Sequence, residues 1–150
     1  MICSIRSACF SEVLEVEKNS FPEPWSQAVF CTILSDPRNK GYAFKVDGVV
    51  RGFVIFRVTK KRLLIGNIAV DPKYRRSKIA TFLMHKVISK LSGERTKICA
   101  TVSEKNLESH LFLKSCGFNA VKVLRNFFKE DDAYDFVFNQ SSFVVTESSK

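Results

Sequence analysis

The clearest pattern of apolar and polar positions lies between Ile65 and Leu91. An apolar run over residues 65–70 predicts a buried strand, and Asp71-Pro72 predicts a turn after it. Beyond a basic segment at residues 73–78, apolar residues recur every four positions, which is the spacing of one face of a helix. These residues are Ile79, Leu83, Val87 and Leu91, with Phe82 and Ile88 beside the same stripe. The sequence therefore predicts a strand, a basic loop and an amphipathic helix in succession.

Similar patterns divide the rest of the chain into helices and strands. Asp47-Gly48 is typical of a hairpin turn and joins two runs of strand-forming residues. Gly117 is placed to end a helix in which Leu107, Leu111 and Phe112 are expected to face inward and His110 outward. The order of elements is typical of an α+β fold with a mixed sheet. In chain order we expect strand 2–6, helix 9–17, helix 26–35, strands 42–46, 49–58 and 63–70, helix 79–91, strand 97–102, helix 106–116, and strands 118–128 and 133–138.

Length and composition fit one domain without covalent cross-links. A chain of 150 residues is typically one domain, and we assign residues 1–139 to it and residues 140–150 to a tail. No apolar run approaches the ~20 residues of a membrane span, and no signal peptide is visible. Five cysteines form an odd number without a CxxC pair, so we expect reduced, mostly buried thiols and neither disulfides nor a metal site. These features favour a cytoplasmic monomer or dimer that does not bind membranes.

Positive charge is concentrated between Arg57 and Lys97. That segment has twelve Lys and Arg residues against two acids, whereas the whole chain has a net charge of +9. Arg75, Arg76 and Lys78 stand where the helix at residue 79 begins, and the unpaired N–H groups of a helix start also attract anions. The pattern therefore predicts a site for a phosphate or pyrophosphate group. A solvated basic surface would give the same charge pattern.

Several separated segments resemble the GCN5-related N-acetyltransferase (GNAT) family, over roughly residues 2–139. They are IAVDPKYR before the basic loop, N-x6-LKSCGF from Asn106 onward, an FP…W segment at residues 21–25, and an RN-aromatic-aromatic segment at residues 125–128. The last two are typical of the ribosomal-protein-alanine N-acetyltransferase (RimI-like) subfamily, to which the chain is most similar in pattern. The resemblance implies the GNAT fold, a mixed, mostly antiparallel seven-stranded sheet flanked by four helices. It also implies transfer of an acetyl group from acetyl-CoA to an amine.

The acyl-CoA segment of the family reads Q/R-x-x-G-x-G/A, and residues 75–80 occupy its place. Arg75 and Ala80 match, whereas Lys78 stands at the first glycine. We expect Lys78 to take an ordinary helical φ, which needs no glycine, and to point its side chain outward. The resemblance implies that one strand pairs with the pantetheine arm, that the helix start binds the diphosphate, and that the next helix adds a contact. The residues concerned are Ile68, Ala69 and Val70; Arg75, Arg76, Ser77, Lys78, Ile79, Ala80 and Thr81; and Asn106.

The resemblance also places the general base of the subfamily at Thr101 and its general acid at Leu113. Neither side chain exchanges a proton at neutral pH, yet a base or a water chain must still accept a proton from the amine. Glu23, in the FPEPW segment that the family places over the acceptor, is our candidate for this base. His110 titrates in the useful range, but the helical pattern places it on the outer face.

Several functions fit these observations. The acceptor that the resemblance implies is the amine of a peptide or protein N-terminus, and a small amine or a lysine side chain is the alternative. The acidic residues 130–132 offer negative charge to a basic protein tail, although a solvated turn explains them equally well. Because Thr101, Leu113 and Lys78 depart from the family pattern, a catalytically silent domain that binds CoA or a partner protein is a second alternative. Nucleic-acid binding is a third, but the aromatic residues fall mainly on predicted buried faces, which argues against it.

Overall fold

A computed structural model of the protein describes residues 1–140 and confirms the α+β architecture. Apart from Gln140, the expected tail at residues 140–150 lies outside the described residues. The elements are β1 (Ile2–Ser4), α1 (Phe10–Ser20), α2 (Gln27–Ser35), β2 (Asn39–Val46), β3 (Val49–Val58), β4 (Arg62–Val70), α3 (Ile79–Ile88), β5 (Lys97–Ser103), α4 (Leu107–Ser115), β6 (Asn119–Phe128) and β7 (Asp131–Asn139). Short 3-10 helices at Ser7–Cys9 and Pro72–Tyr74 precede α1 and α3.

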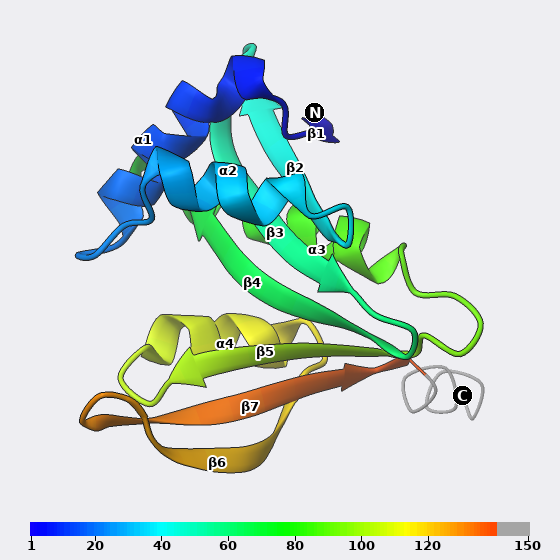
Figure 1. Ribbon diagram of the computed structural model, residues 1–150. Coiled ribbons are helices and arrows are strands. Elements are labelled where there is room, and N and C mark those ends of the chain that lie inside the picture. Colours follow the sequence, from blue (N-terminus) through cyan, green and yellow to red (C-terminus); the bar gives the residue numbers. More distant parts are fainter. Residues whose placement is uncertain (141–150) are drawn as a thin grey trace. The chain divides into compact units, whose positions relative to one another are not determined.

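Within residues 1–140 the strands form one seven-stranded sheet in the order β1-β2-β3-β4-β5-β7-β6 (Figure 1). Strands β4 and β5 pair in parallel, whereas the pairs β1–β2, β2–β3, β5–β7 and β6–β7 are antiparallel. The sheet is therefore mixed and mostly antiparallel, as the resemblance implies. None of the helices in the described part of the chain has the length and apolar character needed to span a bilayer.

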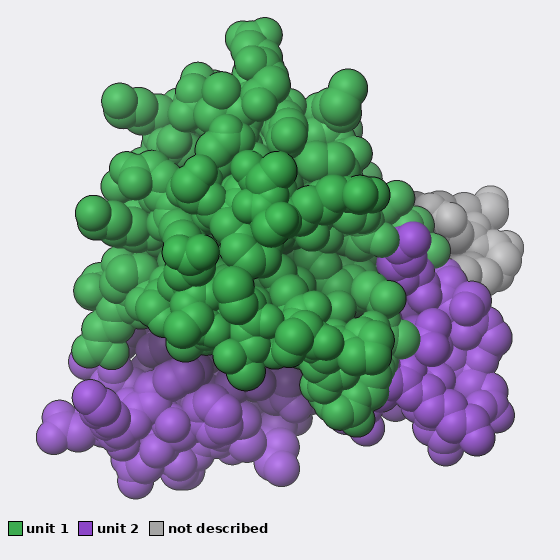
Figure 2. All heavy atoms as spheres, turned by 45° about the horizontal axis from the view of Figure 1, so that its top comes forward, with its two compact units in different colours: residues 1–58, 66–89 green, residues 59–65, 90–150 purple. Residues whose placement is uncertain are grey.

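The chain folds as two compact units, which Figure 2 shows in different colours. Among the described residues, unit 1 consists of residues 1–58 and 66–89, and unit 2 of residues 59–65 and 90–140. Strand β4 thus contributes its first residues to unit 2 and its last residues to unit 1. The ladder between β4 and β5 covers three residue pairs, from Arg62–Lys97 to Leu64–Cys99, and all of them belong to unit 2.

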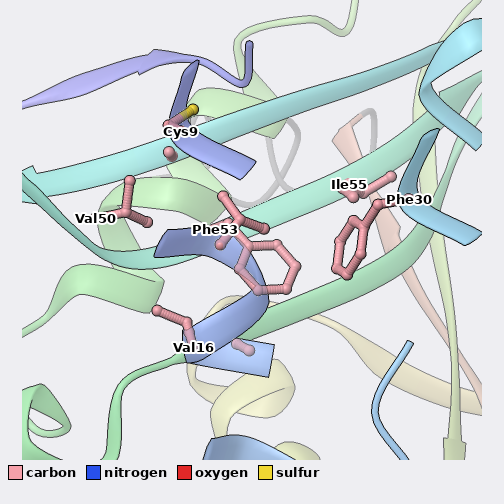
Figure 3. Close-up of a cluster of buried hydrophobic side chains, with 9 residues drawn as sticks. Cys9, Val16, Phe30, Val50, Phe53 and Ile55 are labelled. Carbon is pink, nitrogen blue, oxygen red and sulfur yellow. The ribbon is translucent and has the colours of Figure 1, made fainter. Parts of the chain in front are cut away.

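In unit 1, α1 and α2 cover one face of strands β2 and β3, and α3 covers the other (Figure 1). On the α3 face, Phe44 of β2 stacks on Phe82 with 5.8 Å between ring centroids. Gly52 of β3 permits a close approach of α3, because a Cβ there would lie 2.8 Å from the Ile79 side chain. The opposite face carries a cluster of buried side chains (Figure 3): Cys9, Val13, Val16, Phe30, Ala43, Val50, Phe53, Ile55 and Ala69.

The predicted strand and helix around the basic loop are confirmed in outline and differ in detail. The expected apolar stripe of α3 is buried at Ile79, Leu83 and Val87. Phe82 is instead 48% exposed, whereas Met84, outside the predicted stripe, is fully buried. The helix ends at Ile88, before the predicted end at Leu91. Strand β4 is fully buried only in its last two residues and at Leu63, so residues 65–68 are less buried than predicted.

In unit 2, β7 pairs with β5 on one side and with β6 on the other. Gly117 ends α4 with a φ of 93°, a conformation that favours glycine, as its position predicts. Asp131 and Asp132, expected in a turn, already belong to β7, and the turn itself lies at Lys129 and Glu130.

The orientation of α4 differs from the prediction. Leu107 and Leu111 are 65% and 61% exposed, so the expectation that they face inward is wrong. The inward face instead carries Leu113, which is 3% exposed, and His110, whose ring centroid lies 5.0 Å from that of Phe136. Residues 110 and 113 are three positions apart and therefore lie on one side of the helix.

Candidate functional site

The last residues of β4 have one edge directed away from β3. The N–H of Asp71, just after the strand, donates to the C=O of Arg51 in β3 at 2.7 Å. Backbone polar groups point to alternate sides along a strand, so those of Ala69 also face β3 and those of Ile68 and Val70 face the other edge. An extended ligand can therefore pair with this edge through Ile68 and Val70.

The C=O of Val70 already has donors within the protein. The Arg75 Nε lies 3.1 Å from this oxygen and the Ser20 Oγ lies 3.5 Å from it. Among the described residues, no partner contacts the N–H of Val70 or the backbone groups of Ile68 on this edge, so these groups can bind a ligand. The Arg75 guanidinium is thereby directed back toward β4, which fixes the start of the basic loop.

The turn after β4 is held by its own side chains. A carboxylate oxygen of Asp71 accepts from the Lys73 N–H at 3.0 Å, and the other lies 3.5 Å from the Arg51 guanidinium. The same guanidinium lies over the Tyr74 ring at 4.5 Å from its centroid. These contacts fix the direction in which the chain leaves β4 and enters the basic loop.

Lys78 has a left-handed backbone, with φ 67° and ψ 14°. Arg76, two residues earlier, also has a positive φ of 65°. Our expectation of an ordinary helical φ at Lys78 is therefore wrong. The left-handed region costs an L-residue roughly 1–2 kcal/mol and is the region in which glycine is favoured. The loop thus keeps the conformation for which the family motif has glycine, and Lys78 adopts it with strain.

The start of α3 presents unpaired donors. Phe82 is the residue whose N–H donates to the C=O of Lys78, at 3.0 Å. The N–H groups of Ile79, Ala80 and Thr81 precede this bond and have no acceptor within the helix. The side chains of residues 76–78 are exposed beside them. Free N–H groups at the positive end of a helix, next to cationic side chains, suit a diphosphate, so this donor set fits the group that the resemblance implies.

A buried carboxylate anchors the loop that carries Glu23. Glu17 of α1 is 1% exposed, and its two oxygens accept from the Trp25 N–H at 2.8 Å and from the Asn67 Nδ2 at 2.7 Å. The Trp25 ring packs edge-on against Phe30, with 5.3 Å between centroids. Glu23 is exposed within this loop. Sequence reasoning missed Glu17, although its position four residues after Val13 on the apolar face of α1 was a signal.

Unit 2 contains the remaining predicted residues. The Asn106 side chain accepts from the Ser109 N–H at 3.2 Å and so caps α4. Leu113 is buried and Thr101 is exposed on β5. Glu23 and the predicted cofactor residues 68–81 belong to unit 1, whereas Asn106 belongs to unit 2.

His110 is not on the outer face, contrary to our prediction. Its Nε2 lies 2.9 Å from the C=O of Ser103, and its ring packs edge-on against Tyr134 at 5.3 Å between centroids. A carbonyl oxygen only accepts, so Nε2 carries the hydrogen of this bond. The hydrogen bond explains how a polar ring occupies a position that the apolar pattern did not indicate.

Two acidic residues near the β6–β7 turn form ion pairs with basic side chains of unit 2. Asp132 pairs with Arg125 at 2.8 Å and accepts from the Asn126 N–H at 2.8 Å. Both donors lower the pKa of Asp132, and the Asn126 N–H has the larger effect. Asp131 pairs with Lys105 at 2.9 Å. Of the three acids that were expected to attract a basic tail, Asp132 thus joins the two strands of the hairpin and Asp131 joins the hairpin to the segment before α4.

The cysteines are unpaired thiols. Cys9 and Cys99 are buried, Cys3 and Cys116 are partly buried and Cys31 is exposed, so the expectation of buried thiols is met at Cys9 and Cys99 only. Burial raises the pKa of Cys99 and of Cys116.

Comparison with known proteins decides the family. A sequence profile of the acetyltransferase (GNAT) family matches residues 2–118. The chain belongs to this family. The [ribosomal protein bS18]-alanine N-acetyltransferase of Escherichia coli K12 is a GNAT relative, 26% identical over 133 residues, which are 87% of this chain and 88% of the relative.

Solved structures confirm the GNAT fold. The ribosomal-protein-S18-alanine N-acetyltransferase from E. coli superposes with a TM-score of 0.84 at 23% identity, covering 93% of this chain and 92% of that one. Arabidopsis thaliana NAA60 in complex with acetyl-CoA superposes with a TM-score of 0.79 at 19% identity, covering 94% and 99%. As a GNAT member the protein is an acyltransferase.

Proposed function

We propose that the protein transfers the acetyl group of acetyl-CoA to the amine of a peptide or protein N-terminus. The observation that carries this proposal is the loop with positive φ at Arg76 and Lys78, which leads into the start of α3. There the N–H groups of residues 79–81 have no acceptor within the helix and lie among cationic side chains. This arrangement suits a diphosphate. Membership of the GNAT family supplies the reaction class, and the A. thaliana neighbour is described as a complex with acetyl-CoA.

The donor would be held mainly by unit 1. In this proposal Ile68 and Val70 pair with the amides of the pantetheine arm as an added strand would, and Ala69 lies between them. The N–H groups of residues 79–81 and the side chains of Arg76, Ser77 and Lys78 receive the diphosphate. Arg75 contributes by fixing the loop to β4, and Asn106 remains a predicted contact to the cofactor.

The acceptor side is supported by the loop around Glu23. The E. coli relative is named for an alanine of a ribosomal protein, which favours an N-terminal amine over a lysine side chain or a small amine. Glu17 holds the loop through the Trp25 N–H, so the exposed Glu23 carboxylate is carried by an ordered segment. Its role as general base remains a prediction, as does the cytoplasmic location.

Thermal shift measurements test the donor site. We expect millimolar acetyl-CoA to raise the melting temperature of the wild type, because a ligand that binds only the folded state stabilises it. The double variant Arg75→Glu/Arg76→Glu should lose this rise. No shift in the wild type would overturn the donor site.

Release of free thiol from acetyl-CoA tests the reaction. We expect release with peptides that have a free N-terminus and much less with N-terminally blocked, lysine-containing peptides or with small amines. Faster release with the blocked lysine-containing peptides or with small amines would show that the acceptor is a lysine side chain or a small amine instead. A thermal shift without thiol release for any amine would favour the catalytically silent alternative, which the residues at positions 101 and 113 motivate.

A further inference from the structure

Within residues 1–140, one partly buried carboxylate has neither a hydrogen bond nor an ion pair with the protein, that of Asp135. The other buried or partly buried carboxylates accept from backbone N–H groups or pair with cationic or amide side chains: Glu12, Glu17, Asp36, Asp71, Asp131 and Asp132. A carboxylate without a partner keeps its oxygens free to accept a proton. Asp135 is therefore set apart from the other acids of the fold.

The strand register defines where this carboxylate points. The N–H of Glu104 donates to the C=O of Asp132 at 2.9 Å, so these residues form a hydrogen-bonded pair of the β5–β7 ladder. Bonded and non-bonded pairs alternate along an antiparallel ladder, which makes Thr101 and Asp135 a non-bonded pair. Side chains of such a pair share one face, with Cβ atoms about 4.5–5.5 Å apart. Asp135 thus lies on the same face as the exposed Thr101.

That face of unit 2 is distinct from the one that α4 covers. The neighbouring residues Tyr134 and Phe136 contact His110 of α4, and side chains alternate along β7. The titratable and charged groups of unit 2 that share the Asp135 face are Lys97 and Cys99 of β5, Asp131 of β7, Lys122 of β6, which is the register partner of Asp135, and Arg62 of β4, which is the register partner of Lys97. Burial raises the pKa of the Cys99 thiol, and the Asp135 charge adds to the rise. The carboxylate is therefore close enough to act on its neighbours.

We propose that Asp135 is the catalytic base of the acetyl transfer, a proposal that rests on the proposed function. The acceptor ammonium gives one proton to the Asp135 carboxylate, and the freed lone pair forms the C–N bond to the acetyl carbon. The C–S bond breaks, the sulfur keeps its electron pair, and it takes the second proton of the nitrogen. One ammonium and one thioester give one amide, one thiol and one proton, which passes from Asp135 to water. General-base catalysis of this kind contributes roughly 10²–10⁴-fold.

Steady-state kinetics with a free N-terminal peptide, followed from pH 5 to pH 10, test this proposal. We expect Asp135→Asn to lower kcat about 100-fold or more, with the KM for acetyl-CoA within about threefold of wild type. Its rate should keep rising with pH, because hydroxide replaces the missing base. Asp131→Asn, on the same strand, is the matched control and should retain wild-type kcat. Adding Thr101→Glu to Asp135→Asn should raise kcat at least about tenfold over Asp135→Asn alone, because the new carboxylate is attached to the residue directly opposite Asp135.

The outcomes are distinguishable. Wild-type-like kinetics for Asp135→Asn, or a loss with an unchanged pH profile and no recovery on adding Thr101→Glu, would overturn the assignment alone. Absence of transfer to any amine by the wild type would overturn both the proposed function and this role for Asp135. Glu23→Gln belongs in the same series. If it changes the pH profile while Asp135→Asn does not, the base is Glu23.

Discussion

The Glu17 carboxylate accepts a hydrogen bond from the Asn67 Nδ2 at 2.7 Å, which joins the middle of α1 to β4. Its other oxygen holds the Trp25 N–H at 2.8 Å. In Glu17→Gln one acceptor becomes an NH2 group that faces a donor, while the volume stays the same. Hydrogen bonds to charged groups are worth about 1.5–3 kcal/mol, so we expect a loss of about 2–3 kcal/mol in the free energy of unfolding. Urea denaturation measures this loss.

The matched control is Glu15→Gln on the exposed face of the same helix, which should change stability by less than about 0.5 kcal/mol. Because Glu17 positions the loop at residues 21–26, its variant should also raise the KM for the acceptor peptide more than the KM for acetyl-CoA. Equal stability of the two variants would contradict the anchoring role.

The left-handed backbone of Lys78 predicts that glycine is better tolerated there than alanine. Lys78→Gly and Lys78→Ala both remove the side chain, but alanine retains the strain of a positive φ. Strain relief of about 1–2 kcal/mol is partly offset by the greater freedom of glycine in the unfolded chain, about 0.5–1 kcal/mol. We expect the glycine variant to be more stable than the alanine variant by about 0.5–1 kcal/mol in chemical denaturation. A more stable alanine variant would show that the loop relaxes to another conformation.

Arg75 and Arg76 should differ in what they contribute. Arg75 donates to the Val70 C=O, so Arg75→Glu should destabilise the protein by about 1–2 kcal/mol. Arg76 makes no such bond among the described residues and is exposed, so Arg76→Glu should leave stability within about 0.5 kcal/mol while reducing the thermal shift caused by acetyl-CoA. The control is Lys73→Glu, which reverses a charge in the same loop at a residue that is not among the predicted acetyl-CoA-binding residues. A thermal shift that falls equally in Lys73→Glu and Arg76→Glu would indicate general charge attraction rather than a defined site.

Local signals made most elements of this fold predictable from the sequence. Ser26 caps α2 by accepting from the Val29 N–H at 3.3 Å, and Asp47 and Gly48 both take the positive φ of a tight hairpin turn. Each feature depends on residues within a few positions, which is why pattern reasoning finds it. The same holds for the α3 stripe at Ile79, Leu83 and Val87.

The sequence-based predictions are wrong where contacts between residues far apart in the sequence determine which way a side chain faces. Leu107 and Leu111 have helical spacing, yet α4 turns His110 toward the sheet because Ser103 supplies an acceptor and Phe136 a packing surface. The pairing of Thr101 with Asp135 depends on the register of two strands that are separated by α4 and β6. Sequence spacing does not encode that register, so the resemblance pointed to position 101 and gave no reason to consider position 135.

The lowered pKa of Asp132 predicts a pH dependence of stability. The Asn126 N–H and the Arg125 guanidinium favour its charged form, so its folded pKa lies below the ordinary value of 3.8. A carboxyl with a lowered folded pKa stabilises the protein above its unfolded pKa, and this stabilisation is lost as the pH falls through the folded pKa. Asp132→Asn should therefore be less stable than wild type at pH 7, and the difference should shrink below about pH 4. Urea denaturation at both pH values measures it, with Glu130→Gln in the neighbouring turn as the control.

Cysteine reactivity should follow burial and pKa. The thiolate is the reactive form, so alkylation is slow where the thiol is shielded and its pKa is raised. We expect iodoacetamide at neutral pH to modify exposed Cys31 first and Cys99 and Cys116 much more slowly, as measured by mass spectrometry of peptides over time.

The Asp135→Asn variant extends this measurement. Removing the carboxylate charge lowers the pKa of Cys99, whose rise Asp135 partly causes, so Cys99 should react faster at a given pH while Cys116 is unchanged. Burial remains the larger cause, so Cys99 should still react more slowly than Cys31. An unaltered rate of Cys99 alkylation would show that the Asp135 carboxylate points away from Cys99 and Thr101 of β5. The catalytic base would then have to be another residue.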